Sequence, residues 1–156
     1  MKHKFKQAYM SVAETFAKLS HCERAKVGAI IVKADRIISI GYNGMPAGYD
    51  NCCEHTIHHH DLGTTTVTSR PEVLHAEANA IAKLAQSSES SDGAVMFCTH
   101  TPCIECAKLI HQAGIAKVYY RQDYDAGKGS GKQLLKDKLE QVQWLTKENT
   151  AKRMVT

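Results

Sequence analysis

Residues 94–111 have the sequence AVMFCTHTPCIECAKLIH, in which an apolar run leads directly into a helix-start pattern. Residues 94–99 suit a buried strand, because they are almost all apolar. Thr101 and Pro102 then predict the start of a helix, as its N-cap and its first-turn proline. The helix is expected to run to about His111. A strand that passes directly into a helix favours an α/β fold.

The flanking segments continue this alternation of strands and helices. Helices are predicted over 5–19, 73–86 and 132–139, and strands over 27–32, 36–40, 117–120 and 142–144. The apolar positions at helical spacing in the first helix are Phe5, Ala8, Val12, Phe16 and Leu19. Strands 27–32 and 36–40 are predicted to form a hairpin that turns at Ala34-Asp35. The pattern predicts a three-layer α/β/α sandwich with a central mixed five-stranded sheet, in one domain over 1–156.

The segment from Asp50 to Arg70 shows no clear hydrophobic period and is predicted to be irregular. Its chemistry-bearing residues are Cys52, Cys53, His55, His58, His59 and His60. An irregular stretch of this length inside a compact domain is usually functional or tied to a metal.

Composition narrows the class of protein. The chain has six cysteines and nine histidines, and its N-terminus lacks the pattern of a secretory signal. A cytoplasmic location is therefore expected, in which thiolates bind metal rather than form disulfides. No apolar run is long enough to span a membrane. The net charge of +4 comes from scattered basic residues, which argues against a nucleic-acid partner and suits an anionic small molecule.

Two short motifs carry the chemistry, namely His75-Ala-Glu77 and Pro102-Cys103-Ile-Glu-Cys106. Both lie at predicted helix starts, where the helix dipole favours thiolates. His75, Cys103 and Cys106 would give zinc three protein ligands and leave one position open for water, which is the catalytic arrangement. Glu77 is close enough to take the proton of that water without being a ligand, and to pass it to a substrate.

Each motif alone has an ordinary alternative. A lone Cys-x-x-Cys could be a redox pair or half of a zinc ribbon, and a lone histidine at a helix start is usually a polar end. The chain has no second Cys-x-x-Cys to close a ribbon. The combination of His-x-Glu with Pro-Cys-x-x-Cys is the pattern of zinc nucleobase deaminases. A non-catalytic zinc module is the rival from another class, and Glu77 argues against it.

The chain resembles the deoxycytidylate (dCMP) deaminase family of the cytidine-deaminase superfamily, and its short form resembles phage members. The His-Ala-Glu and Pro-Cys-x-x-Cys motifs indicate the superfamily, whereas Gly-Tyr-Asn-Gly (41–44) and the tyrosine after the fourth strand indicate the family. The similarity also covers the stretches 22–32, 45–48, 51–54, 71–81, 101–108 and 120–125.

This resemblance implies hydrolysis of dCMP to dUMP and ammonia at a catalytic zinc, in which zinc-bound water attacks the ring carbon that bears the amine while Glu77 shuttles protons. It also implies a homohexamer that is activated by dCTP with magnesium and inhibited by dTTP with magnesium. The expected location becomes the host cytoplasm if the chain is encoded by a phage.

By the same resemblance, Asn43 holds the deoxyribose and Tyr124 contacts the substrate near its phosphate. Arg24 is a candidate phosphate contact, with a plain surface arginine as the alternative. The segment from residue 41 to residue 48 would border the effector, and the alternative for it is a simple turn after a strand. The effector residues taken from this segment are Gly41, Tyr42, Asn43, Gly44 and Gly48.

Some phage members carry a second, structural zinc, and Cys22 and Cys52 match two of its ligands. Glu72 and a histidine, of which His60 is our choice among His55, His58, His59 and His60, would complete it. Glu72 stands one position further from His75 than the family pattern requires. The alternative is a pair of buried free cysteines and a solvated run of histidines.

The nearest rival functions belong to the same superfamily, namely deamination of free cytidine or of adenosine in tRNA. A tRNA-binding enzyme would need a wider basic surface than this sequence offers. Preference for the monophosphate over the nucleoside would exclude a cytidine deaminase.

Overall fold

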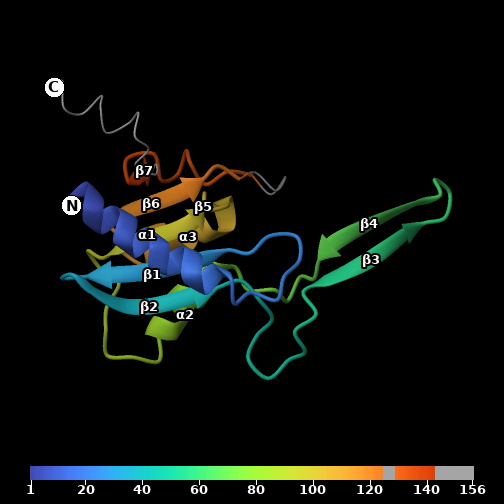
Figure 1. Ribbon diagram of the computed structural model, residues 1–156, viewed down its shortest axis with the longest axis horizontal. Helices are drawn as coiled ribbons and strands as arrows, with labels where there is room; N and C mark the ends of the chain where they lie inside the picture. The colour runs from blue at the N-terminus through green and yellow to red at the C-terminus, as the bar shows by residue number, and fades with distance from the viewer. Residues whose placement is uncertain (125–128, 143–156) are drawn as a thin grey trace.

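Five strands form one mixed sheet in the order β2-β1-β5-β6-β7 (Figure 1). The structure, a computed structural model, describes residues 1–124 and 129–142. The strands are β1 (Gly28–Lys33), β2 (Arg36–Tyr42), β5 (Val95–His100), β6 (Lys117–Gln122) and β7 (Leu139–Gln141). β1 pairs antiparallel with both β2 and β5, whereas β6 pairs parallel with both β5 and β7. The predicted mixed five-stranded sheet is confirmed.

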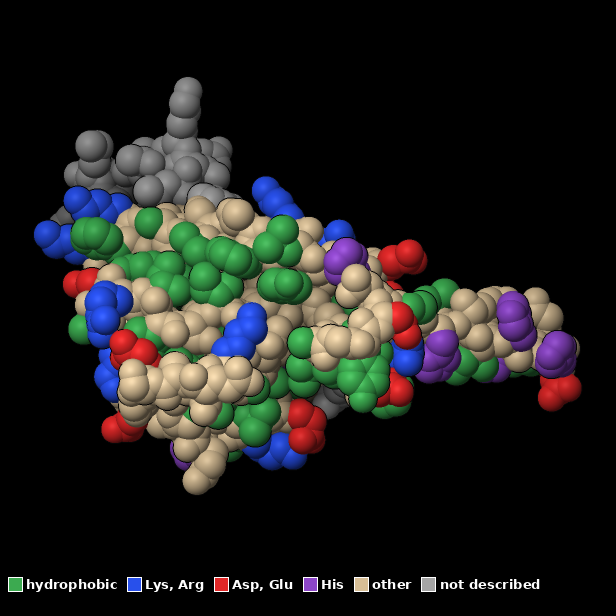
Figure 2. Space-filling view, turned by 90° about the horizontal axis from the view of Figure 1, so that it is seen from below, with side chains coloured by type: hydrophobic (Ala, Val, Ile, Leu, Met, Phe, Trp, Pro, Cys, Tyr) green, Lys and Arg blue, Asp and Glu red, His purple; other side chains and the backbone are tan. Residues whose placement is uncertain are grey.

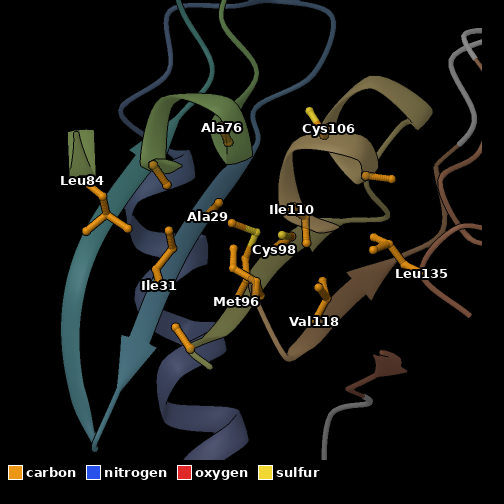
Figure 3. Packing of buried hydrophobic residues seen from close by; sticks show 14 residues of the cluster. Ala29, Ile31, Ala76, Leu84, Met96, Cys98, Cys106, Ile110, Val118 and Leu135 are labelled. Atoms are coloured by element: carbon orange, nitrogen blue, oxygen red, sulfur yellow. The ribbon is translucent and has the colours of Figure 1, made fainter. Parts of the chain in front are cut away.

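Helices cover both faces of this sheet. They are α1 (His3–Ala17), α2 (Ala76–Leu84) and α3 (Ile104–Gln112). Side chains of a strand alternate between faces, so Ile30 and Val32 pack under α1, whereas Ala29 and Ile31 pack with α2 and α3. Figure 3 shows the cluster of buried residues that contains Ala29 and Ile31. In this cluster the starts of α2 and α3 lie side by side over the sheet. The predicted three-layer sandwich is therefore confirmed.

The first helix forms where the sequence predicts it, but it buries a different face. Its buried residues are Met10, Ala13 and Ala17. Phe5 and Leu19, which belong to the apolar stripe noted in the sequence, are 48% and 53% exposed. Two of the three buried residues are alanines, and α1 comes so close to β1 that a Cβ added at Gly28 would lie 2.0 Å from the carbonyl oxygen of Ala13.

Residues 54–69 form a hairpin rather than the predicted irregular segment. β3 (Glu54–His59) pairs antiparallel with β4 (Thr64–Ser69), and the two strands project away from the body of the molecule (Figure 1). Most of their side chains are exposed on both faces, so polar and apolar residues do not alternate. Figure 2 shows histidines along this projecting arm and basic side chains spread over the body. The prediction that this segment is irregular is therefore wrong.

The C-terminal part of the described chain also differs from expectation. Residues 132–138 form consecutive turns, not the predicted helix, and β7 occupies residues 139–141. Of the strand predicted over 142–144, Val142 lies outside β7, and the other two residues fall beyond the described part of the chain. Within the described residues, none of the helices is both long and apolar enough to cross a membrane.

Candidate active site and metal centre

The two sequence motifs meet at the starts of two adjacent helices. His75 is the N-cap residue of α2, and Cys103 is the N-cap residue of α3. Both have extended backbones, and neither side chain caps its own helix. The predicted N-cap, Thr101, lies further upstream and donates its hydroxyl to the carbonyl of Gln122. The N-cap positions are thus occupied by residues whose side chains turn toward a common point.

Three potential ligand atoms converge at that point. Nδ1 of His75 lies 3.4 Å from Sγ of Cys103 and 3.4 Å from Sγ of Cys106. All three atoms lie within 4.8 Å of one another, and no other such group exists among the described residues. Tetrahedral zinc with ordinary Zn–S and Zn–N bonds separates its ligands by about 3.5 Å. The predicted zinc ligands are therefore brought together with spacing and chemistry that fit zinc.

The pKa values of the two thiols in this group shift in opposite directions. The hydrogen bond from Cys106 lowers the pKa of Cys103 to about 3, and the side chain of His75 adds to this effect. The same bond raises the pKa of Cys106, which is also buried. The site therefore holds a thiolate at neutral pH, and thiolate is the form that binds metal.

Glu77 lies beside this group on the first turn of α2. Its side chain is only 4% exposed, and burial raises the pKa of its carboxyl. It hydrogen-bonds with the Cys106 side chain, which places it next to the metal ligands. A buried carboxyl with a raised pKa, close to the ligands, is suited to accept and return protons.

A cavity of about 310 Å³ opens onto these residues. Its lining includes all three potential ligands, Glu77 and the three predicted substrate contacts, which are Asn43, Tyr124 and Arg24. Residues from both motifs and from three other segments thus face one space. The sequence prediction of these positions as one site is consistent with that placement.

The structure adds lining residues that the sequence analysis missed, namely Glu54, Ser69, Arg70, His100 and Leu109. His100 ends β5, and its ring packs edge-on against Tyr124 with ring centroids 5.3 Å apart. Burial lowers the pKa of His100, which favours the neutral ring. Its position at the carboxyl end of a parallel strand, directly before the cysteine motif, is a signal that could have found it.

Asn43 uses both ends of its amide on the neighbouring backbone. Its Oδ1 accepts from the N–H of Val27 at 2.8 Å, and its Nδ2 donates to the carbonyl of Ala25 at 2.8 Å. These bonds tie the end of β2 to the segment that enters β1. Asn43 therefore shapes the wall of the cavity, whatever it also offers to a ligand.

The residues predicted for a second zinc do not come together. Cys22 is buried, but the thiol beside it belongs to Cys53, not Cys52. Burial and the contact with Cys22 raise the pKa of Cys53 to about 12. Cys52 is exposed, and its thiol donates to the carbonyl of Glu54 at 3.2 Å.

The remaining members of that predicted set are also elsewhere. His60 lies at the turn end of the projecting hairpin, and a carboxylate oxygen of Glu72 lies 3.7 Å from the guanidinium of Arg70. Within the described residues, this set forms no cluster of potential ligands. The structure does not bring Cys22, Cys52, Glu72 and His60 together, and the second zinc stays a prediction.

The predicted effector segment is joined to the chain that precedes His75. Gly44 and Leu74 exchange two backbone hydrogen bonds, of 3.1 and 2.9 Å. The carbonyl of Tyr42 accepts from Nδ2 of Asn79 in α2. Gly48 has a φ of 89°, which favours glycine, and Gly41 packs tightly against α2.

Comparison with known proteins places these features in a family. Residues 3–122 match the family described as the cytidine and deoxycytidylate deaminase zinc-binding region. The deoxycytidylate deaminase of Enterobacteria phage T4 is 34% identical over 160 residues, which cover 82% of this chain and 83% of that relative. ComE operon protein 2 of Bacillus subtilis is 40% identical over 119 residues, or 76% of this chain, which spans only 59% of that relative.

A solved structure matches most of this chain. The dCMP deaminase of cyanophage S-TIM5, in complex with dCMP and dUMP, is 47% identical with a TM-score of 0.78. The match covers 90% of this chain and 98% of that one. The fold and the metal-binding motifs therefore have counterparts in characterised deaminases.

Proposed function

Because the chain belongs to the cytidine and deoxycytidylate deaminase zinc-binding family, we propose that it hydrolyses dCMP to dUMP and ammonia. The observation that carries this proposal is the convergence of His75, Cys103 and Cys106 beside the buried carboxyl of Glu77, all on one cavity. The relatives from phage T4 and cyanophage S-TIM5 support dCMP as the substrate.

A zinc ion held by the imidazole and the two thiolates would lower the pKa of water and supply a nucleophile near neutral pH. Glu77 then moves protons. Its carboxylate would take a proton from the water that attacks the ring carbon bearing the amine, and would deliver that proton to the adjacent ring nitrogen. The second proton of the same water, left on the hydroxyl at the ring carbon, would pass through the same carboxyl to the amine, so that ammonia leaves and a ring carbonyl remains. Burial suits Glu77 to this role, since it brings the carboxyl pKa closer to neutrality.

The rest of the cavity would hold the sugar and the phosphate. Asn43 keeps one amide hydrogen beyond its bond to Ala25 and can donate it to the deoxyribose. Tyr124, 40% exposed and packed on His100, offers a hydroxyl at the cavity mouth. Arg24 offers a guanidinium to the phosphate, for which its planar pair of donors is well suited.

Regulation by dCTP and dTTP, each with magnesium, is part of this proposal. The segment 41–48 would bind the triphosphate. Two backbone hydrogen bonds between Gly44 and Leu74 connect this segment to the residue directly before His75. An effector can shift activity only through different affinities for two arrangements of this segment. A homohexamer is also proposed, and two exposed apolar side chains, Phe5 near the start of α1 and Leu19 just after its end, support association.

A deamination assay on dCMP, deoxycytidine and cytidine tests the function. Protein loaded with zinc should convert dCMP at the highest kcat/KM, and dCTP should steepen the initial rise of the dCMP saturation curve, whereas dTTP opposes it. Preference for a nucleoside would favour a cytidine deaminase instead. Identical curves with and without effectors would reject regulation and leave the deaminase assignment intact.

A further inference from the structure

The base of the β3–β4 hairpin forms part of the cavity wall. Glu54 is the first residue of β3 and Ser69 is the last residue of β4, and the two face each other in the register of the hairpin. Both line the same cavity as the metal ligands. The arm that projects in Figure 1 is therefore joined to the active site by its first pair of residues.

This pair holds the turn that carries Arg24 from two sides. Oε1 of Glu54 accepts hydrogen bonds from the backbone N–H groups of Glu23 at 3.0 Å and Arg24 at 3.3 Å. The guanidinium of Arg24 donates to Oγ of Ser69 at 3.1 Å. One residue pair thus fixes both the backbone and the side chain of Arg24, although that side chain is exposed.

The charge of Arg24 is not neutralised by a neighbouring side chain. Among the described residues it forms no ion pair, whereas Arg70 on the same cavity lies 3.1 Å from Asp50 and 3.7 Å from Glu72. The carboxylate of Glu54 accepts from two backbone N–H groups and forms no ion pair with the guanidinium. Arg24 therefore has its charge available to an anionic ligand in the cavity.

We propose that Glu54 and Ser69 are positioning residues, which hold Arg24 so that its guanidinium receives the phosphate end of the substrate. The inference rests on the proposed function and adds to it a role for the hairpin. These bonds already restrict the long side chain of Arg24. Binding of a phosphate would therefore cost less side-chain conformational entropy. The base of the hairpin then sets the preference of the enzyme for a nucleotide over a nucleoside.

The test measures kcat/KM for dCMP and for deoxycytidine with zinc-loaded protein, and uses the ratio of the two values as its readout. Ser69→Ala should lower this ratio by about two- to tenfold, through a higher KM for dCMP, because it removes one hydrogen bond of ordinary strength. Arg24→Ala should lower it further, on the order of tenfold or more, because it removes a charged donor. Ser69→Ala should have no additional effect in the Arg24→Ala background.

Glu54 is tested by a pair of variants. Glu54→Ala should lower the ratio as Ser69→Ala does, whereas Glu54→Gln should restore it, because the amide oxygen can accept the same two backbone bonds. Thr65→Ala, which removes a hydroxyl from β4 away from the cavity, is the matched control and should leave both substrates unaffected. Calorimetry measures binding without turnover. The variants that lower the kcat/KM ratio should bind dUMP more weakly and deoxyuridine as the wild type does.

The failures of the two proposals can be told apart. If Arg24→Ala lowers the ratio but Ser69→Ala and Glu54→Ala do not, the positioning role is wrong and the proposed function stands. Equal losses on both substrates would also overturn it, since they would indicate damage to the fold. If the zinc-loaded wild-type protein fails to deaminate dCMP, the proposed function fails and this inference fails with it.

Discussion

Gly41 and Ala76 face each other where β2 meets the first turn of α2, with no room for a side chain between them. A Cβ added at Gly41 would lie 2.2 Å from the carbonyl oxygen of Ala76 and 2.5 Å from the N of Ala80. Both are backbone atoms, so the helix itself would have to move. Because α2 carries His75 at its N-cap and Glu77 in its first turn, the contact at Gly41 fixes the position of the metal centre relative to the sheet.

We expect Gly41→Ala to destabilise the protein by about 1–3 kcal/mol, as overpacking of a tight contact does, and to lower deaminase activity. Thermal melting of the zinc-loaded protein measures the first effect, and dCMP turnover the second. Gly44→Ala is the control for stability, because a Cβ at Gly44 meets nothing within 4 Å. If both variants melt like the wild type, the close approach of β2 and α2 does not constrain the helix.

The zinc content should depend on the cysteine motif and not on the cysteines of the segment that precedes the hairpin. Cys103→Ser should lose the metal, because Cys103 supplies a ligand atom 3.4 Å from His75 Nδ1. Cys52→Ser is the matched control and should keep it, because Cys52 is exposed and its thiol donates to the carbonyl of Glu54. Elemental analysis after purification without added metal gives the answer. Loss of metal in Cys52→Ser would contradict this expectation and support a second zinc.

Glu77→Gln should fold, retain zinc and lose dCMP deamination by about a hundred- to ten-thousandfold, the contribution typical of a general acid–base group. Its melting temperature should not fall, because the change removes a carboxyl that is 4% exposed and costly to ionise. Glu89→Gln, which changes a carboxyl that pairs with Arg36 on the surface, should leave activity intact. Wild-type turnover in Glu77→Gln would refute the assigned mechanism.

The sequence predicts those parts of the molecule in which the pattern of burial is regular. The first hairpin was expected to turn at Ala34-Asp35, and both residues have the positive φ of a tight turn. The metal ligands were predicted because their spacing follows from the chemistry of zinc. The sandwich was predicted because strands and helices alternate along the chain after the first hairpin, and the central strands β1, β5 and β6 are mostly buried, as expected of a sheet covered on both faces.

Elements without that regularity were missed. The β3–β4 hairpin is exposed on both faces, so the usual alternation is absent, and the remaining signal is the β-branched run over 64–68. The run over 132–139 has a helical composition, but residues 132–138 form turns and Leu139 begins β7. The contact between Cys22 and Cys53 depends on which of the side chains of Cys52 and Cys53 faces inward. A resemblance between motifs does not give that orientation.

Gly131 is predicted to hold the cysteine motif in place. Its N–H donates to the carbonyl of Pro102 at 3.0 Å, and a Cβ added there would lie 2.5 Å from Cβ of Ala107 and 2.8 Å from the oxygen of Pro102. The added atom would also lie 2.9 Å from the carbonyl oxygen of Cys103. A side chain at this position must therefore push the start of α3 away, while His75 stays fixed on α2.

Gly131→Ala should fold and bind zinc about ten- to a hundredfold more weakly, as the loss of support around metal ligands typically does. Its dCMP turnover should fall in parallel at limiting zinc and recover partly when zinc is added. Ser130→Ala is the control, because it removes a hydroxyl that accepts from the N–H of Lys132 and adds no atom near Cys103. Competition with a chromogenic chelator measures the affinity. Wild-type affinity in Gly131→Ala would mean that the segment after residue 128 does not position the cysteine motif.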